Sequence, residues 1–468
     1  MPLVWAAPRL KTLLWLRVYC RAGWVWPPLS TLLLALLLGG CQPRLAGLEP
    51  RDVQELPQRP SAYLAAATAD QPLLTADQQQ ERLAQFRARH FAAWHWQAGE
   101  QPGLQDEGLF WALDWLQRGT AYGENLRPLT AERCAQLVAR TAAADYPSLW
   151  RPAISVARCE VRALPTARPL LGDPARAGSG FPFDLLQHGV LPPATPLRVT
   201  HQSPDGSWLL VETALLQGWV PAQQVAWVDE TLMAWLEAAP LVVILRDEQS
   251  LHDGKGRYRG QVGLATLLPL APEPEMLLLP LADALGWAWL VPVPRPAAAQ
   301  DFPLPLTVAR LAALADSLMG QPYGWGELYG NRDCSALVRD LFVPFGLWLP
   351  RNSAAQAGAG QVVELKHLDP AQREQALLQH GQPFVTLVHL PGHILLYLGA
   401  HQGRAALLHN LWGLRTRDLW GREGRWLVGR TLISSLQPGL EQDGLLLRIG
   451  DLRQRVERLT LLLASPSP

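Results

Sequence analysis

The sequence predicts an α+β protein built from several small domains, and three observations support this prediction. The chain has 468 residues, which is too long for one ordinary core. Its residue pattern changes along the chain: apolar residues recur at helical spacing at 76–140, and short β-like runs follow at 150–294. A predicted helix and then consecutive predicted strands come after them. The 41 prolines favour short strands and loops over long helices. Helices followed by strands at the C-terminal end are typical of an α+β layout.

The first forty residues have the pattern of a secretion signal. Basic residues occupy the stretch before residue 22, an apolar run follows at 29–38, and the run ends in L-L-G-G-C at Cys41. A basic flank, a short apolar segment and small residues before a cleavage point are typical of such a signal. The apolar run is shorter than the ~20 residues that span a bilayer, so a transmembrane anchor is the weaker alternative.

The segment L-G-G-C resembles the lipobox of bacterial lipoproteins. The resemblance implies that residues 1–40 are removed as a signal peptide and that the Cys41 thiol is acylated. Gln42 stands where an aspartate would resemble an inner-membrane retention signal. We therefore expect a lipid-anchored protein of the periplasm, on the outer membrane, with the acyl chains supplying the membrane affinity. Because 41 basic residues balance 41 acidic ones, bulk charge gives no reason to expect nucleic acid or an anionic membrane as a partner of the protein body.

Changes of texture divide the rest of the chain. Residues 41–60 are proline-rich and polar and predict a tether. Residues 61–148 carry apolar residues at spacings of three and four and predict a small helical domain. Residues 149–228 and 229–300 hold short β-like runs broken by Pro, Gly and Asp, and predict two small β-barrels in tandem.

A further domain is expected at 301–440. Its first helix ends at Gly320, and a second begins at or just after Cys334, since the apolar residues that follow fall on one helical face. Strands follow in P-F-V-T-L-V-H-L, H-I-L-L-Y-L-G and R-A-A-L-L-H-N-L-W-G. The tail at 441–468 is expected to contain an amphipathic helix that packs on the body.

The cysteines narrow the search for a reactive group. Cys20 leaves with the signal and Cys41 carries lipid, so Cys134, Cys159 and Cys334 remain. In an oxidising compartment Cys134 and Cys159 have the option of pairing, which the sequence leaves open. A free thiol in such a compartment needs a reason, and Cys334 is the candidate.

Cys334 has the surroundings expected of a nucleophile. A helix N-terminus and a nearby imidazole both stabilise a thiolate. His393 opens a strand directly after a Pro-Gly turn, and His409 lies on the next strand, so the two rings are expected to lie close together. A third group that binds the far nitrogen of the base fixes its tautomer. The residues thus predict a Cys-His-His site.

Two other roles for Cys334 compete with this one. A lone cysteine is often a small buried hydrophobe, although Asp333 and Ser335 are unusual neighbours for a core position. A metal site would need helical i,i+4 spacing of His389 and His393, and Pro391 breaks any helix between them. No H-E-x-x-H or C-x-x-C is present, so we expect no metal and no cofactor.

Four segments together resemble the NlpC-type cell-wall cysteine peptidases. They are P-Y-G-W-G-E-L-Y-G-N-R-D-C-S-A-L, L-P-R-N-S-A-A-Q-A, P-G-H-I-L-L-Y-L-G and L-L-H-N-L-W-G-L, in family order within 304–420. The segments R-A-L-P-T, F-P-F-D-L-L-Q, S-P-D-G-S-W and G-W-V also look like the first bacterial SH3-like domain of such enzymes. The resemblance implies a papain-like catalytic domain preceded by SH3-like barrels. It also implies a γ-D-glutamyl-diamino acid endopeptidase that acts on peptidoglycan stem peptides.

The same resemblance implies the roles of individual residues. Cys334 matches the nucleophile, His393 the base and later acid, and His409 the orienting third member. Tyr323 matches a tyrosine beside the oxyanion site, where it would act with the Cys334 backbone N–H. In related enzymes the first barrel restricts the cleft to stems with a free N-terminal L-Ala, and muropeptides or such stems are the expected partners.

Other positions match substrate contacts less directly. Asp333, Ser335 and Ser353 match residues that contact the L-Ala and D-Glu end of the substrate. Trp325, with Tyr329, is expected either to wall the pocket or simply to pack. Glu327 departs from the pattern, because a glycine is frequent at its place in the family, and this puts the conformation of the loop in question.

Three functions remain in competition on the sequence alone. The first is a lipid-anchored endopeptidase. The second is an amidase or acyltransferase that uses the same Cys-His pair. The third is a non-catalytic wall-binding lipoprotein, against which the intact cysteine and histidines argue.

Overall fold

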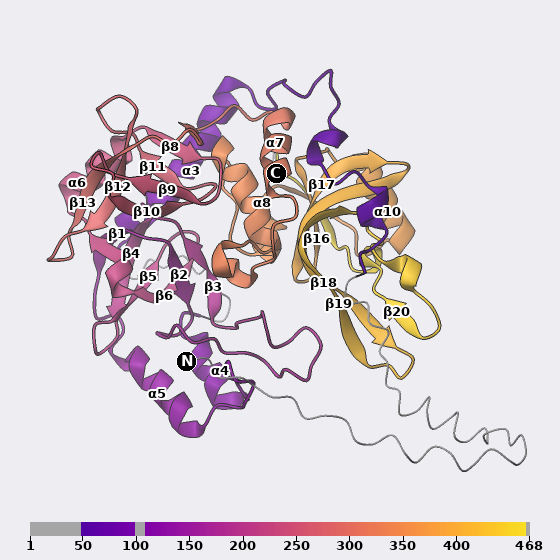
Figure 1. The fold of residues 1–468 in the computed structure, drawn as a ribbon, viewed down its shortest axis with the longest axis horizontal. Helices are drawn as coiled ribbons and strands as arrows, with labels where there is room; N and C mark the ends of the chain where they lie inside the picture. The colour runs from indigo at the N-terminus through magenta and orange to yellow at the C-terminus, as the bar shows by residue number, and fades with distance from the viewer. Residues whose placement is uncertain (1–47, 99–107, 465–468) are drawn as a thin grey trace, which may run out of the picture. The chain divides into compact units, whose positions relative to one another are not determined.

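The structure is a computed structural model that describes residues 48–98 and 108–464 (Figure 1). The expected signal peptide with Cys20, the expected acylation site Cys41 and the first part of the predicted tether lie outside the described residues. Among those described, no helix has the length and apolarity needed to cross a membrane. The α+β prediction is confirmed: helices come first, then two sets of short strands, then helices packed on a larger sheet.

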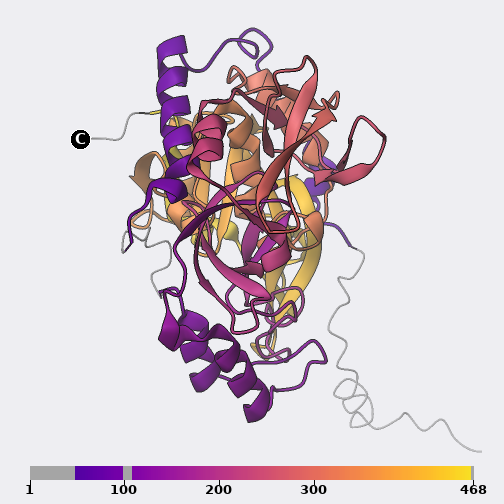
Figure 2. The ribbon, with the colours of Figure 1, turned by 90° about the vertical axis from the view of Figure 1, so that its left-hand side faces the viewer.

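The helices of the region 61–148 share their buried residues with the β regions and the C-terminal domain, and the domain bounds expected there stay a prediction. Thr75 caps the long helix through a reciprocal capping box with Gln78. The buried face of this helix packs on both β regions and the C-terminal domain, and the helices at 111–118 and 131–141 cover the first β region (Figure 2). The helices are α2 (Asp52–Glu55), α3 (Ala76–His95), α4 (Trp111–Arg118) and α5 (Ala131–Thr141).

The first β region is an antiparallel sheet of seven strands in the order β3-β2-β6-β5-β4-β1-β7. Trp219 is fully buried at its centre. Beside it, Gly218 has φ +150°, and a Cβ there would stand 2.6 Å from the carbonyl oxygen of Arg162, so the two strands require glycine to approach so closely. The strands are β1 (Arg151–Ser155), β2 (Cys159–Arg162), β3 (Gln187–Leu191), β4 (Pro196–Gln202), β5 (Trp208–Glu212), β6 (Gln217–Pro221) and β7 (Val225–Trp227).

The second β region follows helix α6 (Glu230–Ala238), whose N-terminus Asp229 caps. Its strands form three small antiparallel sheets, β10-β9, β11-β8-β14 and β12-β13, around one shared core. The strands are β8 (Leu241–Ile244), β9 (Gln249–His252), β10 (Tyr258–Val262), β11 (Leu267–Pro269), β12 (Met276–Ala282), β13 (Ala288–Pro294) and β14 (Ala299–Asp301). Its identification as a second SH3-like barrel stays a prediction.

The C-terminal domain packs helices against an antiparallel sheet in the order β15-β21-β16-β17-β18-β19. Thr307 and Asp333 cap the two central helices, whose apolar faces bury against the sheet as the sequence predicts. The helices are α7 (Val308–Leu318), α8 (Cys334–Phe342), α9 (Ser353–Gln356) and α10 (Pro370–His380). The strands are β15 (Gln361–Glu364), β16 (Thr386–Leu390), β17 (His393–His401), β18 (Arg404–Asp418), β19 (Glu423–Ser434), β20 (Leu447–Ile449) and β21 (Arg458–Leu461).

Two segments differ from expectation. The tail does not form an amphipathic helix: β21 pairs with both β15 and β16, because Leu459 fills the sheet core while Thr460 bonds the Ala357 carbonyl on the opposite face. The part of the tether that is described is also folded. Gln58 exchanges two hydrogen bonds with the backbone of Ile433, so residues 50–60 cover the edge of β19.

Candidate active site

Cys334 is the first residue of α8, where the sequence predicts the nucleophile. The Asp333 side chain caps the helix by accepting a hydrogen bond from the Ala336 N–H at 2.8 Å. Cys334 is 7% exposed, and the backbone N–H groups of Ile394 and Ser335 act to lower the pKa of its thiol. The sulfur therefore lies against the residue that follows His393.

His393 and His409 lie on the neighbouring strands β17 and β18. His393 Nε2 is 2.8 Å from His409 Nδ1, and the ring centroids are 5.1 Å apart. His409 is fully buried. The structure thus brings together the three residues proposed from the sequence: the thiol meets the start of β17, and the first imidazole meets the second.

A chain of hydrogen bonds fixes the tautomer of both imidazoles. The Ser434 hydroxyl donates to the Ser435 carbonyl at 2.8 Å, so its oxygen can only accept from His409 Nε2, which is 2.9 Å away. His409 therefore carries its proton on Nε2 and accepts at Nδ1. His393 must then donate from Nε2, which leaves the lone pair of His393 Nδ1 free to take a proton.

The N-terminal segment supports the end of this chain. Asp52, which is buried, accepts hydrogen bonds from the Ser435 backbone N–H at 2.7 Å and hydroxyl at 2.6 Å. Its other carboxylate oxygen pairs with Arg404. Neither Ser434 nor Asp52 is marked by a local pattern, because their roles depend on the edge of a sheet that only the fold assembles.

Electrostatics in the resting site favour the neutral forms of the Cys334 thiol and the His393 imidazole. Burial raises the pKa of Cys334 to about 12, with a further contribution from the Asp333 carboxylate. Burial, together with the charge of Arg455, lowers the pKa of His393 to about 4. The helix N-terminus expected to favour the thiolate is present, but burial outweighs it, so the site rests as thiol and neutral imidazole.

Tyr323 belongs to an aromatic wall beside the thiol. Burial, followed by the charges of Asp333 and Cys334, raises the pKa of Tyr323, so its hydroxyl keeps its proton. Its ring lies 5.8 Å from that of Trp412. Phe181 and Phe183, from the loop between β2 and β3, pack edge-on against Trp412 at 6.4 Å and 6.1 Å. The first β region therefore contributes to the wall.

Asp333 and Ser335 make internal contacts in addition to lying beside the thiol. The Asp333 carboxylate accepts from the Gly326 N–H at 3.2 Å and from the Ser335 hydroxyl at 2.9 Å, and pairs with Arg351 at 2.7 Å. Ser353 begins α9 and is half-buried. Their contacts with substrate stay predictions, and the structure shows in addition that Asp333 organises the N-terminus of α8.

Trp325 packs on the first β region. Its indole N–H donates to the Asp184 carbonyl at 2.9 Å, and its ring lies 5.1 Å from that of Phe183. Of the two roles expected for it, packing is the one that the contacts describe. The neighbouring Tyr329 is largely exposed.

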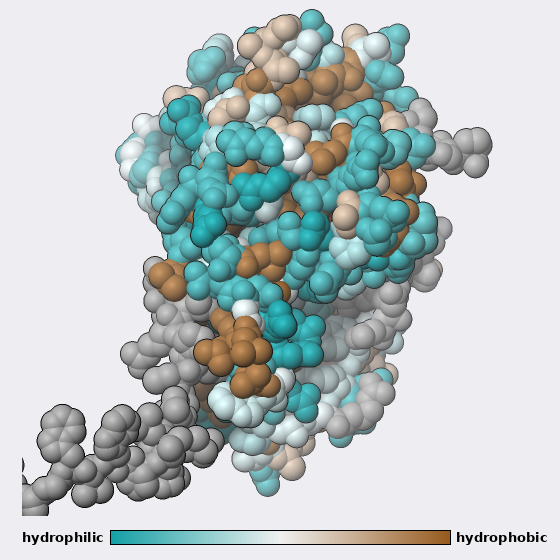
Figure 3. Space-filling view, turned by 90° about the vertical axis from the view of Figure 1, so that its right-hand side faces the viewer, coloured by the Kyte–Doolittle hydropathy of each residue, from teal (hydrophilic) through white to brown (hydrophobic). Residues whose placement is uncertain are grey.

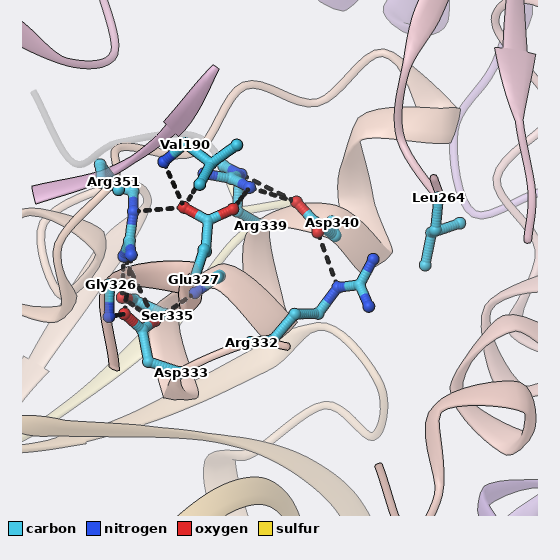
Figure 4. Close-up of polar contacts among 12 residues, drawn as sticks. Val190, Leu264, Gly326, Glu327, Arg332, Asp333, Ser335, Arg339, Asp340 and Arg351 are labelled. Atoms are coloured by element: carbon cyan, nitrogen blue, oxygen red, sulfur yellow. Dashed lines mark hydrogen bonds and ion pairs between the residues drawn. The ribbon is translucent and has the colours of Figure 1, made fainter. Parts of the chain in front are cut away.

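The backbone of Glu327 has a conformation that suits glycine, and its side chain makes contacts that a glycine lacks. Its φ is +66°, in the left-handed region that favours glycine. The buried carboxylate contacts Arg339 at 2.6 Å and Arg351 at 2.8 Å, and accepts from the Val190 N–H of β3 at 3.2 Å (Figure 4). Burial opposes ionisation, but the two arginines outweigh it and lower the pKa of Glu327.

Glu327 and Arg351 thereby connect the first β region to the cap of α8. Arg351 reaches both Glu327 and Asp333, as Figure 4 shows. The Gln187 side chain adds a hydrogen bond to the Gly326 carbonyl at 2.9 Å. The sequence signals for this network were the missing glycine at 327 and the arginine of L-P-R-N-S, but neither revealed a partner.

The remaining cysteines and His389 do not form a second site. Cys134 and Cys159 are both free, and Cys159 lies in the core of the first β region. His389 is buried on β16, and neither of its ring nitrogens has a hydrogen-bond partner. Within 48–98 and 108–464, no three His, Cys, Asp or Glu side chains gather as a metal site.

Comparison with known proteins identifies three regions of the chain. Residues 30–146 match a family model described as the N-terminal NLPC_P60 stabilising domain, and residues 169–221 match an SH3 domain of SH3b1 type. Residues 320–418, which include the thiol and both imidazoles, match the NlpC/P60 family. No curated protein matches the sequence significantly.

Solved structures agree with this assignment at the level of the fold. An NlpC/P60 endopeptidase from Photobacterium damselae subsp. piscicida is 24% identical and covers 88% of this chain and 98% of its own, with a TM-score of 0.80. An NlpC/P60 family protein from Bacillus cereus is 16% identical and covers 59% of this chain and 83% of its own; its TM-score of 0.40 is too low to add to the argument.

Proposed function

Since the chain combines the stabilising, SH3-like and catalytic domains of an NlpC-type peptidase, we propose that it is a lipid-anchored peptidoglycan endopeptidase. The proposed reaction is hydrolysis of the γ-D-glutamyl-diamino acid bond of stem peptides. The observation that carries the proposal is the hydrogen bond between His393 and His409 beside a thiol at a helix N-terminus. A purely structural cysteine needs no such pair.

The first half of the reaction transfers a proton and forms a thioester. His393 Nδ1 takes the Cys334 proton as the sulfur attacks the carbonyl carbon of γ-D-glutamate. The tetrahedral intermediate then collapses, and the imidazolium returns the proton to the leaving amine of the diamino acid. Water, deprotonated by the same nitrogen, hydrolyses the thioester and restores the thiol. His409 keeps the ring of His393 in the productive tautomer through both halves.

Tyr323 supports the charge that develops on the carbonyl oxygen. Its raised pKa keeps the phenol protonated and able to donate near Cys334. With the Cys334 backbone N–H at the start of α8, it supplies donors for the oxyanion. Donors of this kind act more strongly in a site as buried as this one.

The barrel loop supports a preference for short stems with a free N-terminal L-Ala. Phe181 and Phe183 bring the first β region against Trp412 and thus beside the aromatic wall. Glu327 holds that region to the active-site loop. An active site bordered in this way suits the end of a peptide better than the middle of a glycan-linked strand. We propose an outer-membrane, periplasmic location from the Cys41 lipobox alone.

Digestion of defined muropeptides tests the function. Stems with free L-Ala and stems still linked to muramic acid are incubated with the enzyme and with Cys334→Ala, and products are identified by mass spectrometry. We expect Cys334-dependent release of the diamino acid from free stems. Release of whole stems from muramic acid would identify an amidase instead, and binding without any cleavage would identify a wall-binding protein.

A further inference from the structure

The outer end of the catalytic sheet carries an exposed apolar surface. We call it the apolar tip and define it by four side chains that are between 55% and 78% exposed: Leu419, Trp420, Leu445 and Leu446. Figure 3 shows this side of the molecule, where hydrophobic residues gather within hydrophilic surroundings. Isolated surface leucines are common, but a contiguous group this exposed is typical of an interaction site.

The strand register makes the apolar tip contiguous. Asp418 of β18 lies opposite Leu447 of β20. The turn that holds Leu419 and Trp420 follows Asp418 directly, and Leu445 and Leu446 directly precede Leu447. The tip therefore joins the turn between β18 and β19 to the loop before β20.

The described chain begins beside the hairpin that carries the apolar tip. The carbonyl of Leu48, itself half exposed, accepts a hydrogen bond from the Trp426 indole at 2.9 Å. Glu49 pairs with Arg430 of the same strand. Six residues lie between Cys41 and Leu48, and the seven residue steps that join the two positions extend at most about 25 Å. The β18–β19 hairpin runs about 20 Å from Trp426 to its turn. A lipid on Cys41 and the tip can thus reach one bilayer surface.

The charges around the apolar tip suit anionic headgroups. Although the whole chain is neutral, the hairpin end carries Arg415, Arg417, Arg422 and Arg425 against Asp418 and Glu423, and the segment around Leu445 adds Arg448 against Glu441 and Asp443. The Arg422 guanidinium lies 5.1 Å from the centre of the Trp420 ring. Tryptophan and leucine flanked by arginine is a composition that partitions into the interface of a bilayer.

We infer that the apolar tip is a bilayer-contact surface that takes phospholipid headgroups and the outer part of their acyl chains. Trp420 and the leucines enter the interface, and the arginines contact lipid phosphates. The surface would add a second membrane signal to the acyl chains on Cys41, and one acyl chain alone anchors a protein weakly. It would also fix which way the catalytic domain faces.

Vesicle sedimentation of the full chain as Cys41→Ser tests the inference, because this variant has no acyl anchor. Vesicles of phosphatidylethanolamine and phosphatidylglycerol are compared with vesicles of phosphatidylcholine. We expect binding to the anionic vesicles, and a fall in affinity of about tenfold or more when Trp420→Ala and Leu446→Ser are combined, because two large side chains lose their burial.

A matched control distinguishes vesicle binding through the apolar tip from nonspecific hydrophobic binding. Leu285 is 80% exposed in the second β region, far along the chain from the tip. Leu285→Ser is expected to leave vesicle binding unchanged, and all these variants are expected to cleave stem peptides as the parent does. The inference is overturned if the anionic vesicles bind no protein or if Leu285→Ser weakens binding equally. It is also overturned if the tip variants lose binding to purified cell-wall sacculi instead.

Discussion

His393 donates a hydrogen bond from Nε2 to Nδ1 of His409 over 2.8 Å, and the hydroxyl of Ser434 sets the direction of that bond. The Ser434 hydroxyl can only accept from His409, since its own proton is committed to the Ser435 carbonyl. Nδ1 of His393, the nitrogen proposed as the base, is therefore unprotonated. This relationship ties the catalytic chemistry to the edge strand β19 and to Asp52, which holds Ser435.

Removal of the Ser434 hydroxyl tests the tautomer assignment. Ser434→Ala leaves His409 Nε2 without its acceptor, so the other tautomers of both rings become accessible. We expect kcat to fall roughly ten- to hundredfold with little change in KM, because substrate contacts are intact. Ser434→Thr keeps a hydroxyl and should recover most of the rate. Equal losses in both variants would show that Ser434 acts only by packing.

The neutral resting site predicts how Cys334 reacts with an alkylating reagent. With its pKa raised to about 12 by burial and that of His393 lowered to about 4, little thiolate exists at neutral pH. The rate of carboxamidomethylation at Cys334, measured by peptide mass spectrometry, should keep rising from pH 7 to pH 10. Cys334→Ala provides the background from the other thiols. A rate that is already constant between pH 5 and pH 8 would instead indicate a preformed thiolate-imidazolium pair.

Replacement of Glu327 tests the contact between the first β region and the active-site loop. Glu327→Gln removes the charge that Arg339 and Arg351 surround, and leaves two buried cations under-compensated. We expect the free energy of unfolding to fall by about 3–5 kcal/mol. Glu160→Gln is the control, since its carboxylate is partly exposed and only 3.7 Å from a single arginine, Arg158; a loss below about 1 kcal/mol is expected there. Similar losses in both variants would contradict the role given to Glu327.

His188, which lies outside the site, predicts that the folded protein loses stability in mild acid. Burial lowers the pKa of His188 to about 4, and its ring bonds the Gln217 carbonyl and the Trp111 indole. The unfolded chain takes up a proton near pH 6.5, where the folded chain does not, so stability is complete above that pH and is lost as pH falls toward 4. Urea unfolding across this range should show the decline, and His188→Gln should flatten it. A curve for His188→Gln parallel to that of the parent would exclude this residue as a cause.

The sequence predicted the elements that local patterns specify. The helix from Cys334 was predictable from the apolar spacing behind an Asp cap, and the strands of His393 and His409 from their alternating runs. Their approach followed from adjacency along the chain. Contacts between distant segments were not predictable: Asp52 meets Ser435 across 383 residues, and Glu327 meets Val190 across 137. The sequence predicts a helix at 458–461, although R-L-T-L fits the spacing of a helix and of a strand equally. The segment is a strand because it pairs with β15 and β16.

The measurement that tests the account most directly is cleavage of the synthetic peptide L-Ala-γ-D-Glu-diaminopimelate. Reaction of the enzyme, Cys334→Ala and His393→Gln with this peptide is followed by mass spectrometry. The Cys334–His393 mechanism predicts that the enzyme alone releases L-Ala-D-Glu and free diaminopimelate. The cleavage rate should fall at least about a thousandfold in both variants. An intact peptide after incubation with the folded enzyme, or cleavage that persists in Cys334→Ala, would contradict it.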